Sequence, residues 1–138
     1  MAVVLVDTGI LYAMADMDDA WHESVKAFLK NAKDILVLPI TVVPEICYLL
    51  NTHLGPCAER KFLASLLGGE FKIEGMNNQD FRRSYQLLEV YSEMNIGMVD
   101  ASIVAIAERL KIPRLMTTDR RHFSVIRPRH CQTFELLP

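Results

Sequence analysis

Hydrophobic residues follow two kinds of pattern along this chain. Short continuous runs rich in Val, Ile and Leu are typical of strands buried on both faces of a parallel sheet. These runs predict strands at Val3–Val6, Ile35–Leu38 and Arg114–Thr118, with weaker ones at Phe71–Ile73 and Gln132–Glu135. Longer stretches, in which apolar residues recur every three or four positions, predict amphipathic helices. They cover Ile10–Met14, Asp18–Asn31, Thr41–Leu54, Cys57–Leu67, Asn77–Met94 and Val99–Leu110.

The alternation of strands and helices predicts an α/β fold with a mostly parallel sheet and right-handed crossovers. A length of 138 residues is that of one compact domain, and no repeat or low-complexity tract divides the chain. We therefore expect a single domain over residues 1–138. In a sheet of this kind, functional sites form beyond the carboxyl ends of the strands.

The composition is that of a chain with a continuous core, because 51% of the residues are hydrophobic and 23% are charged. The apolar run before Asp7 is too short for a signal peptide or a membrane span and has no basic flank. We therefore expect a cytoplasmic protein without membrane segments. The three cysteines lack C-x-x-C spacing, so neither a disulfide framework nor a zinc site is indicated.

The net charge of -2 gives no overall attraction to nucleic acid. The basic residues are unevenly distributed, however, since seven of the fifteen lie between Arg109 and Arg129. Such a cluster is consistent either with a local surface that attracts phosphate or with a solvated basic face.

Two aspartates follow strands directly. Asp7 comes after Val3–Val6, and Asp119 comes after the strand that ends at Thr118. Each alone is explained by a turn or by a helix cap, which stabilises a helix start by about 1 kcal/mol. Because the carboxyl ends of parallel strands share one edge of the sheet, the pair indicates a site more strongly than either residue does alone.

Two further acids lie on predicted helices. Glu45 has mainly apolar neighbours three and four positions away, which predicts a face packed on the sheet, where a carboxylate is rarely buried without a partner. Pro44 makes the start of that helix and the direction of Glu45 uncertain, and an exposed position is the alternative. Asp100 opens a segment of small and apolar residues, and its alternative role is helix capping.

Four carboxylates at one sheet edge would repel one another at neutral pH unless a cation lay between them. Oxygen ligands without His or Cys favour a hard ion, so Mg²⁺ or Mn²⁺ is expected rather than zinc. The expected direct ligands are Asp7 and Asp100, with Asp119 binding directly or through water. Glu45 would share the ion or orient and deprotonate the attacking water in phosphodiester hydrolysis. Supporting hydrogen bonds are expected from the hydroxyls beside these acids, those of Thr8, Ser102 and Thr118, unless these only cap helices.

The chain resembles the PIN-domain nucleases, and in particular the VapC toxins of bacterial and archaeal toxin–antitoxin pairs. The resemblance covers almost the whole chain, and its order and spacing are more specific than any one piece. The motifs that carry it are Val-Leu-Val-Asp7-Thr8-Gly, Pro44-Glu45, Asp100-Ala-Ser-Ile-Val-Ala-Ile-Ala and Thr117-Thr118-Asp119-Arg-Arg-His-Phe123.

The resemblance implies an α/β/α sandwich with a mostly parallel central sheet of four to five strands, and an acidic quartet at the four positions above. It further implies endoribonuclease activity with Mg²⁺ or Mn²⁺, homodimerisation, and inhibition by a cognate antitoxin. We expect the antitoxin to bind the region Pro44–Leu67. Exposed-looking side chains there, unless they pack on the core instead, are Phe62, Leu63, Leu66 and Leu67.

Several alternatives remain. A haloacid-dehalogenase-type phosphatase would carry Asp-x-Asp, whereas Gly9 stands where the second acid belongs. A receiver domain would need a pair of acids near the end of the first strand. A PIN-domain nuclease that processes RNA without an antitoxin, and a PIN-like scaffold that binds RNA or protein without cutting, differ from the toxin only in activity and partner.

Overall fold

The computed structural model, which describes residues 2–138, contains a five-stranded sheet with the order β3-β2-β1-β4-β5. All four strand pairs are parallel, as in the register Val4↔Leu36 between β1 and β2. The predicted α/β fold is therefore confirmed, and its sheet is entirely rather than mostly parallel. The strands are β1 (Val3–Val6), β2 (Ile35–Pro39), β3 (Lys72–Glu74), β4 (Arg114–Met116) and β5 (Glu135–Leu137).

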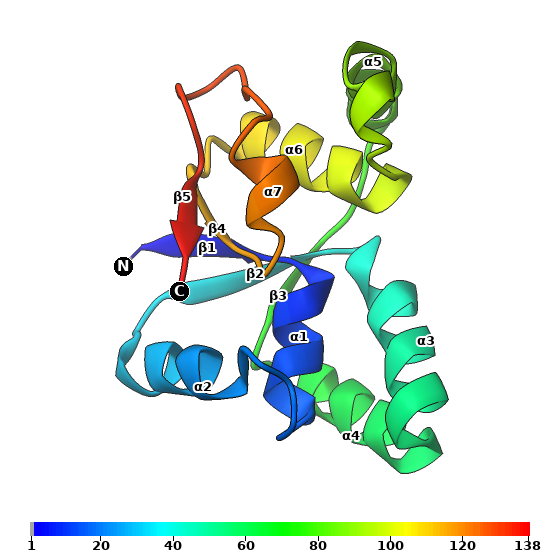
Figure 1. Ribbon diagram of the computed structural model, residues 1–138, viewed down its shortest axis with the longest axis vertical. Helices are drawn as coiled ribbons and strands as arrows, with labels where there is room; N and C mark the ends of the chain where they lie inside the picture. Colours follow the sequence, from blue (N-terminus) through cyan, green and yellow to red (C-terminus); the bar gives the residue numbers. More distant parts are fainter. Residues whose placement is uncertain (1) are drawn as a thin grey trace.

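Helices cover both faces of the sheet and form an α/β/α sandwich (Figure 1). One face carries α1 (Thr8–Ala15), α2 (His22–Asn31), α3 (Val42–Leu54) and α4 (Pro56–Leu67). The other carries α5 (Asn78–Val90), the 3-10 turn η1 (Ser92–Met94), α6 (Met98–Leu110) and α7 (Arg120–Phe123). No helix within residues 2–138 is long and apolar enough to cross a membrane.

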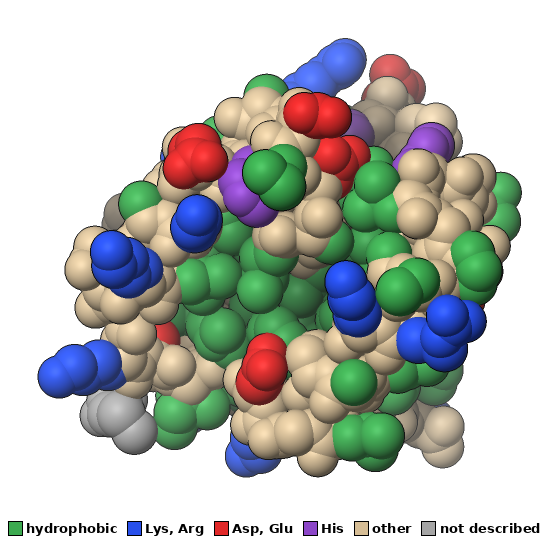
Figure 2. Space-filling view, turned by 90° about the horizontal axis from the view of Figure 1, so that it is seen from below, with side chains coloured by type: hydrophobic (Ala, Val, Ile, Leu, Met, Phe, Trp, Pro, Cys, Tyr) green, Lys and Arg blue, Asp and Glu red, His purple; other side chains and the backbone are tan. Residues whose placement is uncertain are grey.

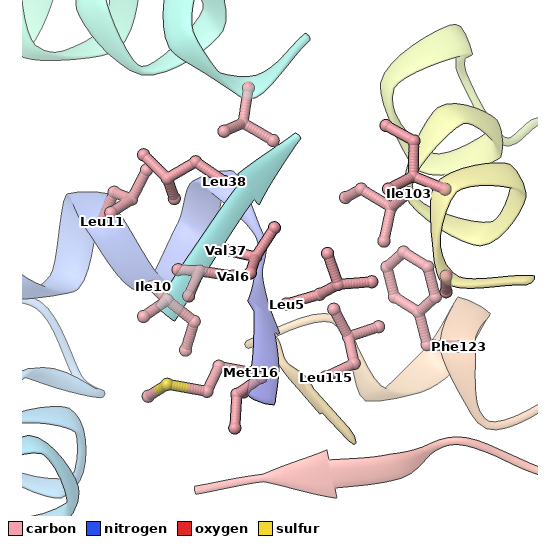
Figure 3. Packing of buried hydrophobic residues seen from close by; sticks show 14 of the residues in the cluster. Leu5, Val6, Ile10, Leu11, Val37, Leu38, Ile103, Leu115, Met116 and Phe123 are labelled. Carbon is pink, nitrogen blue, oxygen red and sulfur yellow. The ribbon is translucent and has the colours of Figure 1, made fainter. Parts of the chain in front are cut away.

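The core lies on both sides of the central strands, because side chains alternate between the two faces of a sheet. Leu5 of β1 and Leu115 of β4 point towards α6 and α7, where Ile103 and Phe123 meet them (Figure 3). All four of these side chains are completely buried. Burying one such side chain contributes about 1.5–3 kcal/mol, so the helices are firmly fixed to the sheet that positions the acids.

Most predicted boundaries agree with the structure to within a few residues. β5 begins at Glu135, where the predicted strand ends, and α7 was not predicted because four residues are too few to show a helical period. α3 begins at Val42, so Pro44 is its third residue. A proline is tolerated there because the first four N–H groups of a helix have no partner within it.

The outer face of α5 differs from the prediction of a single apolar side. Leu88 packs against the core, but Phe81 and Tyr85 are 54% and 64% exposed. The buried face of α5 is partly polar, with Asp80, which accepts from Arg109, and Ser84, whose hydroxyl donates to a backbone carbonyl. Hydrophobic spacing alone therefore selected the wrong side of this helix.

Candidate functional site

Asp7 lies at the carboxyl end of β1, the central strand, and caps α1. Its Oδ1 accepts from the backbone N–H of Thr8 at 2.7 Å, and its Oδ2 accepts from the Thr117 hydroxyl at 2.7 Å. The residue is only 7% exposed. Both explanations for Asp7 thus apply at once, because the helix cap uses one oxygen while the carboxylate lies at the sheet edge.

Burial raises the pKa of Asp7 to about 6, against the lowering effect of its two hydrogen bonds. The negative charges of Asp100 and Glu45 raise the pKa further. These interactions show that the fold brings acids from β1, α3 and α6 into one cluster. Within residues 2–138, no Lys or Arg forms an ion pair with Asp7.

Glu45 occupies the first turn of α3 and is exposed, so the prediction that it projects from a buried face is wrong. Val42, Ile46 and Leu50 form the buried stripe of α3, and Glu45 lies beside it. Its carboxylate still belongs to the cluster, since its charge raises the pKa values of both Asp7 and Asp100.

Asp100 is the third residue of α6, where its Oδ2 accepts from the backbone N–H of Gly97 at 3.4 Å. Burial raises the pKa of Asp100, and the charges of Asp119 and Glu45 act in the same direction. The seven residues from Ala101 to Ala107 are all buried. The small side chains among them allow α6 to lie close to the sheet, as predicted, and bring Asp100 to the cluster.

Asp119 begins α7 as its N-cap and is held by His122 through both oxygens. The backbone N–H of His122 donates to Oδ1 at 3.0 Å, and the ring Nδ1 lies 2.7 Å from Oδ2. Asp100, Asp119 and His122 can each place one ligand atom within 4.8 Å of the others. Sequence reasoning did not single out His122, although its position three residues after an N-cap acid was a usable signal.

The hydroxyls differ from those expected. Ser102 donates to the Val99 carbonyl and accepts from Thr41, both at 2.6 Å, so its bonds join α6 to the start of α3. Thr8 supports Asp7 through its backbone, while its buried hydroxyl has no partner among the described residues. Thr117, rather than Thr118, donates to Asp7, and its Oγ1 also accepts from the backbone N–H of Asp119 at 2.9 Å.

A divalent cation fits this cluster. Its donors are carboxylate oxygens from four elements, and among residues 2–138 the only basic side chain paired with any of the four acids is that of His122. A buried acid that lacks a cationic partner is destabilised when ionised, and a bound cation would remove that penalty. An all-oxygen set suits Mg²⁺ or Mn²⁺.

The basic cluster near the C-terminus is largely engaged within the protein. Arg109 pairs with Glu74 and with Asp80 on the start of α5, at 3.0 and 3.1 Å. Arg114 pairs with Asp34 and with Glu135. At these two positions the structural role accounts for the charge, and no phosphate needs to be invoked.

An apolar groove of about 440 Å³ lies between α1, α3 and α4, and we call it the α1–α4 groove. The face on which α2 and α4 lie shows a hollow lined with hydrophobic side chains (Figure 2). No residue of α4 is fully buried, and Leu63 and Leu67 are 42% and 91% exposed. The apolar residues that line the groove include Leu11, Met14, Leu50, Leu54, Ala58, Phe62 and Phe71.

Comparisons with known proteins agree with this geometry. Residues 4–127 match the family model described as PIN domain. The chain is 31% identical over 135 residues to ribonuclease VapC26 of Mycobacterium tuberculosis, an alignment that covers 98% of this chain and all of that protein.

Two solved structures share the fold. The toxin VapC20 of Mycobacterium tuberculosis, described as cleaving the sarcin-ricin loop, superposes with a TM-score of 0.80 at 21% identity, over 86% of this chain and 91% of that one. VapBC2 of Rickettsia felis, solved with a DNA fragment from its promoter, gives a TM-score of 0.69 at 16% identity, over 99% of each chain.

Proposed function

The chain belongs to the PIN-domain family, and we propose that it is a Mg²⁺- or Mn²⁺-dependent endoribonuclease that acts as the toxin of a toxin–antitoxin pair. The observation that carries the proposal is the cluster of Asp7, Glu45, Asp100 and Asp119, with Asp7 buried and without a Lys or Arg partner among the described residues. Acids in such an environment fit a role in metal-assisted hydrolysis better than a structural one.

In this proposal Asp7, Asp100 and Asp119 hold the ion. When bound, the ion supplies Lewis acidity, which makes water more acidic and stabilises charge on the phosphate. Glu45 is suited to accept the proton of the attacking water, because it is exposed and adjoins the other acids. Thr117 orients the Asp7 carboxylate, and its contact with the Asp119 backbone fixes the spacing of two ligands.

The antitoxin is proposed to bind the α1–α4 groove. The groove is apolar, with Lys61 and Glu70 as the charged residues of its lining, and Glu45 stands on α3, one of its walls. An amphipathic segment that fills such a groove would bury the exposed leucines of α4 and could extend towards the acids. Homodimerisation and a cytoplasmic location complete the proposal, both from the family resemblance.

The test is RNA cleavage by purified protein in Mg²⁺, in Mn²⁺ and in EDTA. Asp7→Asn should lower the cleavage rate by about 10³-fold, which corresponds to the several kcal/mol that a catalytic metal contributes. Asp18→Asn, at an exposed acid beyond α1, is the matched control and should cut as the wild type does.

Cleavage that survives EDTA or Asp7→Asn would refute the metal mechanism. Binding of RNA without cleavage, in either metal, would support the non-catalytic scaffold instead. Co-expression separates the toxin from an RNA-processing enzyme, since only a toxin should be released from inhibition when the antitoxin is removed.

A further inference from the structure

His122 connects two elements through its ring. Its Nδ1 lies 2.7 Å from Oδ2 of Asp119, and its Nε2 lies 3.1 Å from the backbone carbonyl oxygen of Met94. Met94 ends η1, the turn that precedes α6, and α6 carries Asp100 in its first turn. The ring therefore lies between the α7 acid and the segment that leads to the α6 acid.

Both partners of the ring are hydrogen-bond acceptors. A carbonyl oxygen only accepts, so Nε2 donates to Met94, and Nδ1 likewise donates to the ionised carboxylate of Asp119. In this arrangement neither ring nitrogen offers a free lone pair to a metal ion. His122 can therefore act on the site through Asp119, although its atoms lie near those of Asp100 and Asp119.

The ring is well placed to fix a carboxylate rather than merely to contact it. Together with its own backbone N–H, His122 contacts both oxygens of Asp119, which limits rotation of that carboxylate. The backbone N–H of Asp119 donates to Thr117, and Thr117 donates to Asp7. A continuous chain of hydrogen bonds thus runs from Met94 to the buried acid of β1.

We propose that His122 is a positioning residue, which orients the Asp119 carboxylate for the metal ion by donating from Nδ1. The inference rests on the proposed function, since it assumes that Asp119 is a ligand. Loss of a group that orients a ligand typically weakens metal binding by about 10–100-fold. His122→Ala should therefore lower the affinity for Mn²⁺ without removing any ligand.

The experiment measures Mn²⁺ binding without RNA, by the electron paramagnetic resonance signal of the free ion. The amide nitrogen of Asn replaces Nδ1 of a histidine, and that of Gln replaces Nε2. His122→Asn keeps the donor to Asp119, so its affinity should stay within about threefold of wild type, whereas His122→Gln and His122→Ala should both lose about tenfold or more. His130→Ala is the matched control, because the His130 ring contacts the Ile112 carbonyl instead and should not affect Mn²⁺.

Wild-type affinity in His122→Ala, or rescue by Gln rather than Asn, would overturn the inference. The comparison of Asn with Gln remains informative even if His122→Ala folds poorly, because both variants keep a side chain of similar polarity. Since no RNA is present, either result leaves the cleavage test of Asp7→Asn to decide the proposed function separately.

Discussion

Replacing Asp7 by Asn should make the protein more stable at neutral pH while it abolishes activity. The pKa of Asp7 is about 6 in the folded protein, against a model value of 3.8. The folded state therefore binds the proton more tightly, and stability falls as the pH rises from about 4 to 6. Above pH 7 the ionised carboxylate costs about 3 kcal/mol, at 1.36 kcal/mol for each pKa unit.

The substitution removes this cost and preserves the local bonding. An Asn oxygen can accept from the Thr8 N–H, and its amide can donate to the Thr117 hydroxyl, the two groups that contact Asp7. We expect Asp7→Asn to raise the free energy of unfolding by about 2–3 kcal/mol at pH 8, or the melting temperature by about 6–10 °C. The gain should shrink to about 0.5 kcal/mol at pH 4.

The assay is urea unfolding followed by circular dichroism, in EDTA, at several pH values between 4 and 8. In a second series, Mg²⁺ should stabilise the wild type by mass action and leave the variant nearly unchanged. A gain that does not depend on pH, or a loss of stability at pH 8, would refute the reasoning, because it would mean that the Asp7 charge is not destabilising in the metal-free protein.

Two further substitutions test the surroundings of the site. Thr117→Val removes the donor to Asp7, so urea unfolding should show a loss of about 1–2 kcal/mol and RNA cleavage should slow; equal effects of Thr118→Val would contradict this assignment. Arg109→Met leaves Asp80, which is 2% exposed, without its cation, and should cost about 2–4 kcal/mol in the same assay. Wild-type stability of Arg109→Met would show that the pair is energetically neutral.

The sequence allowed the strand-end acids to be predicted because their signals are local. Asp7 directly follows a β-branched run, and Asp119 follows the next strand that pairs with it. The exposure of Glu45 was not predictable in this way. It depends on how α3 is rotated against α1 and the sheet, and the apolar neighbours of Glu45 pack without enclosing its carboxylate.

The choice between neighbouring hydroxyls also exceeded what the sequence could decide. Thr117 and Thr118 lie just beyond β4, where one residue of register determines which side chain faces Asp7. His122 was missed for a similar reason. Its role depends on the Met94 carbonyl, 28 residues earlier in the chain, and on a helix of four residues.

The central position of β1 has a consequence for how the protein is made. The bond from Thr117 to Asp7 joins residues 110 positions apart, and the partner strand β4 is one of the last elements to be translated. At about 5–20 residues per second, the ribosome delivers that strand on the order of 5–20 s after the first. An unfinished chain therefore has Asp7 but lacks the groups that complete its surroundings, so a nascent toxin would stay harmless to the ribosome that is synthesising it.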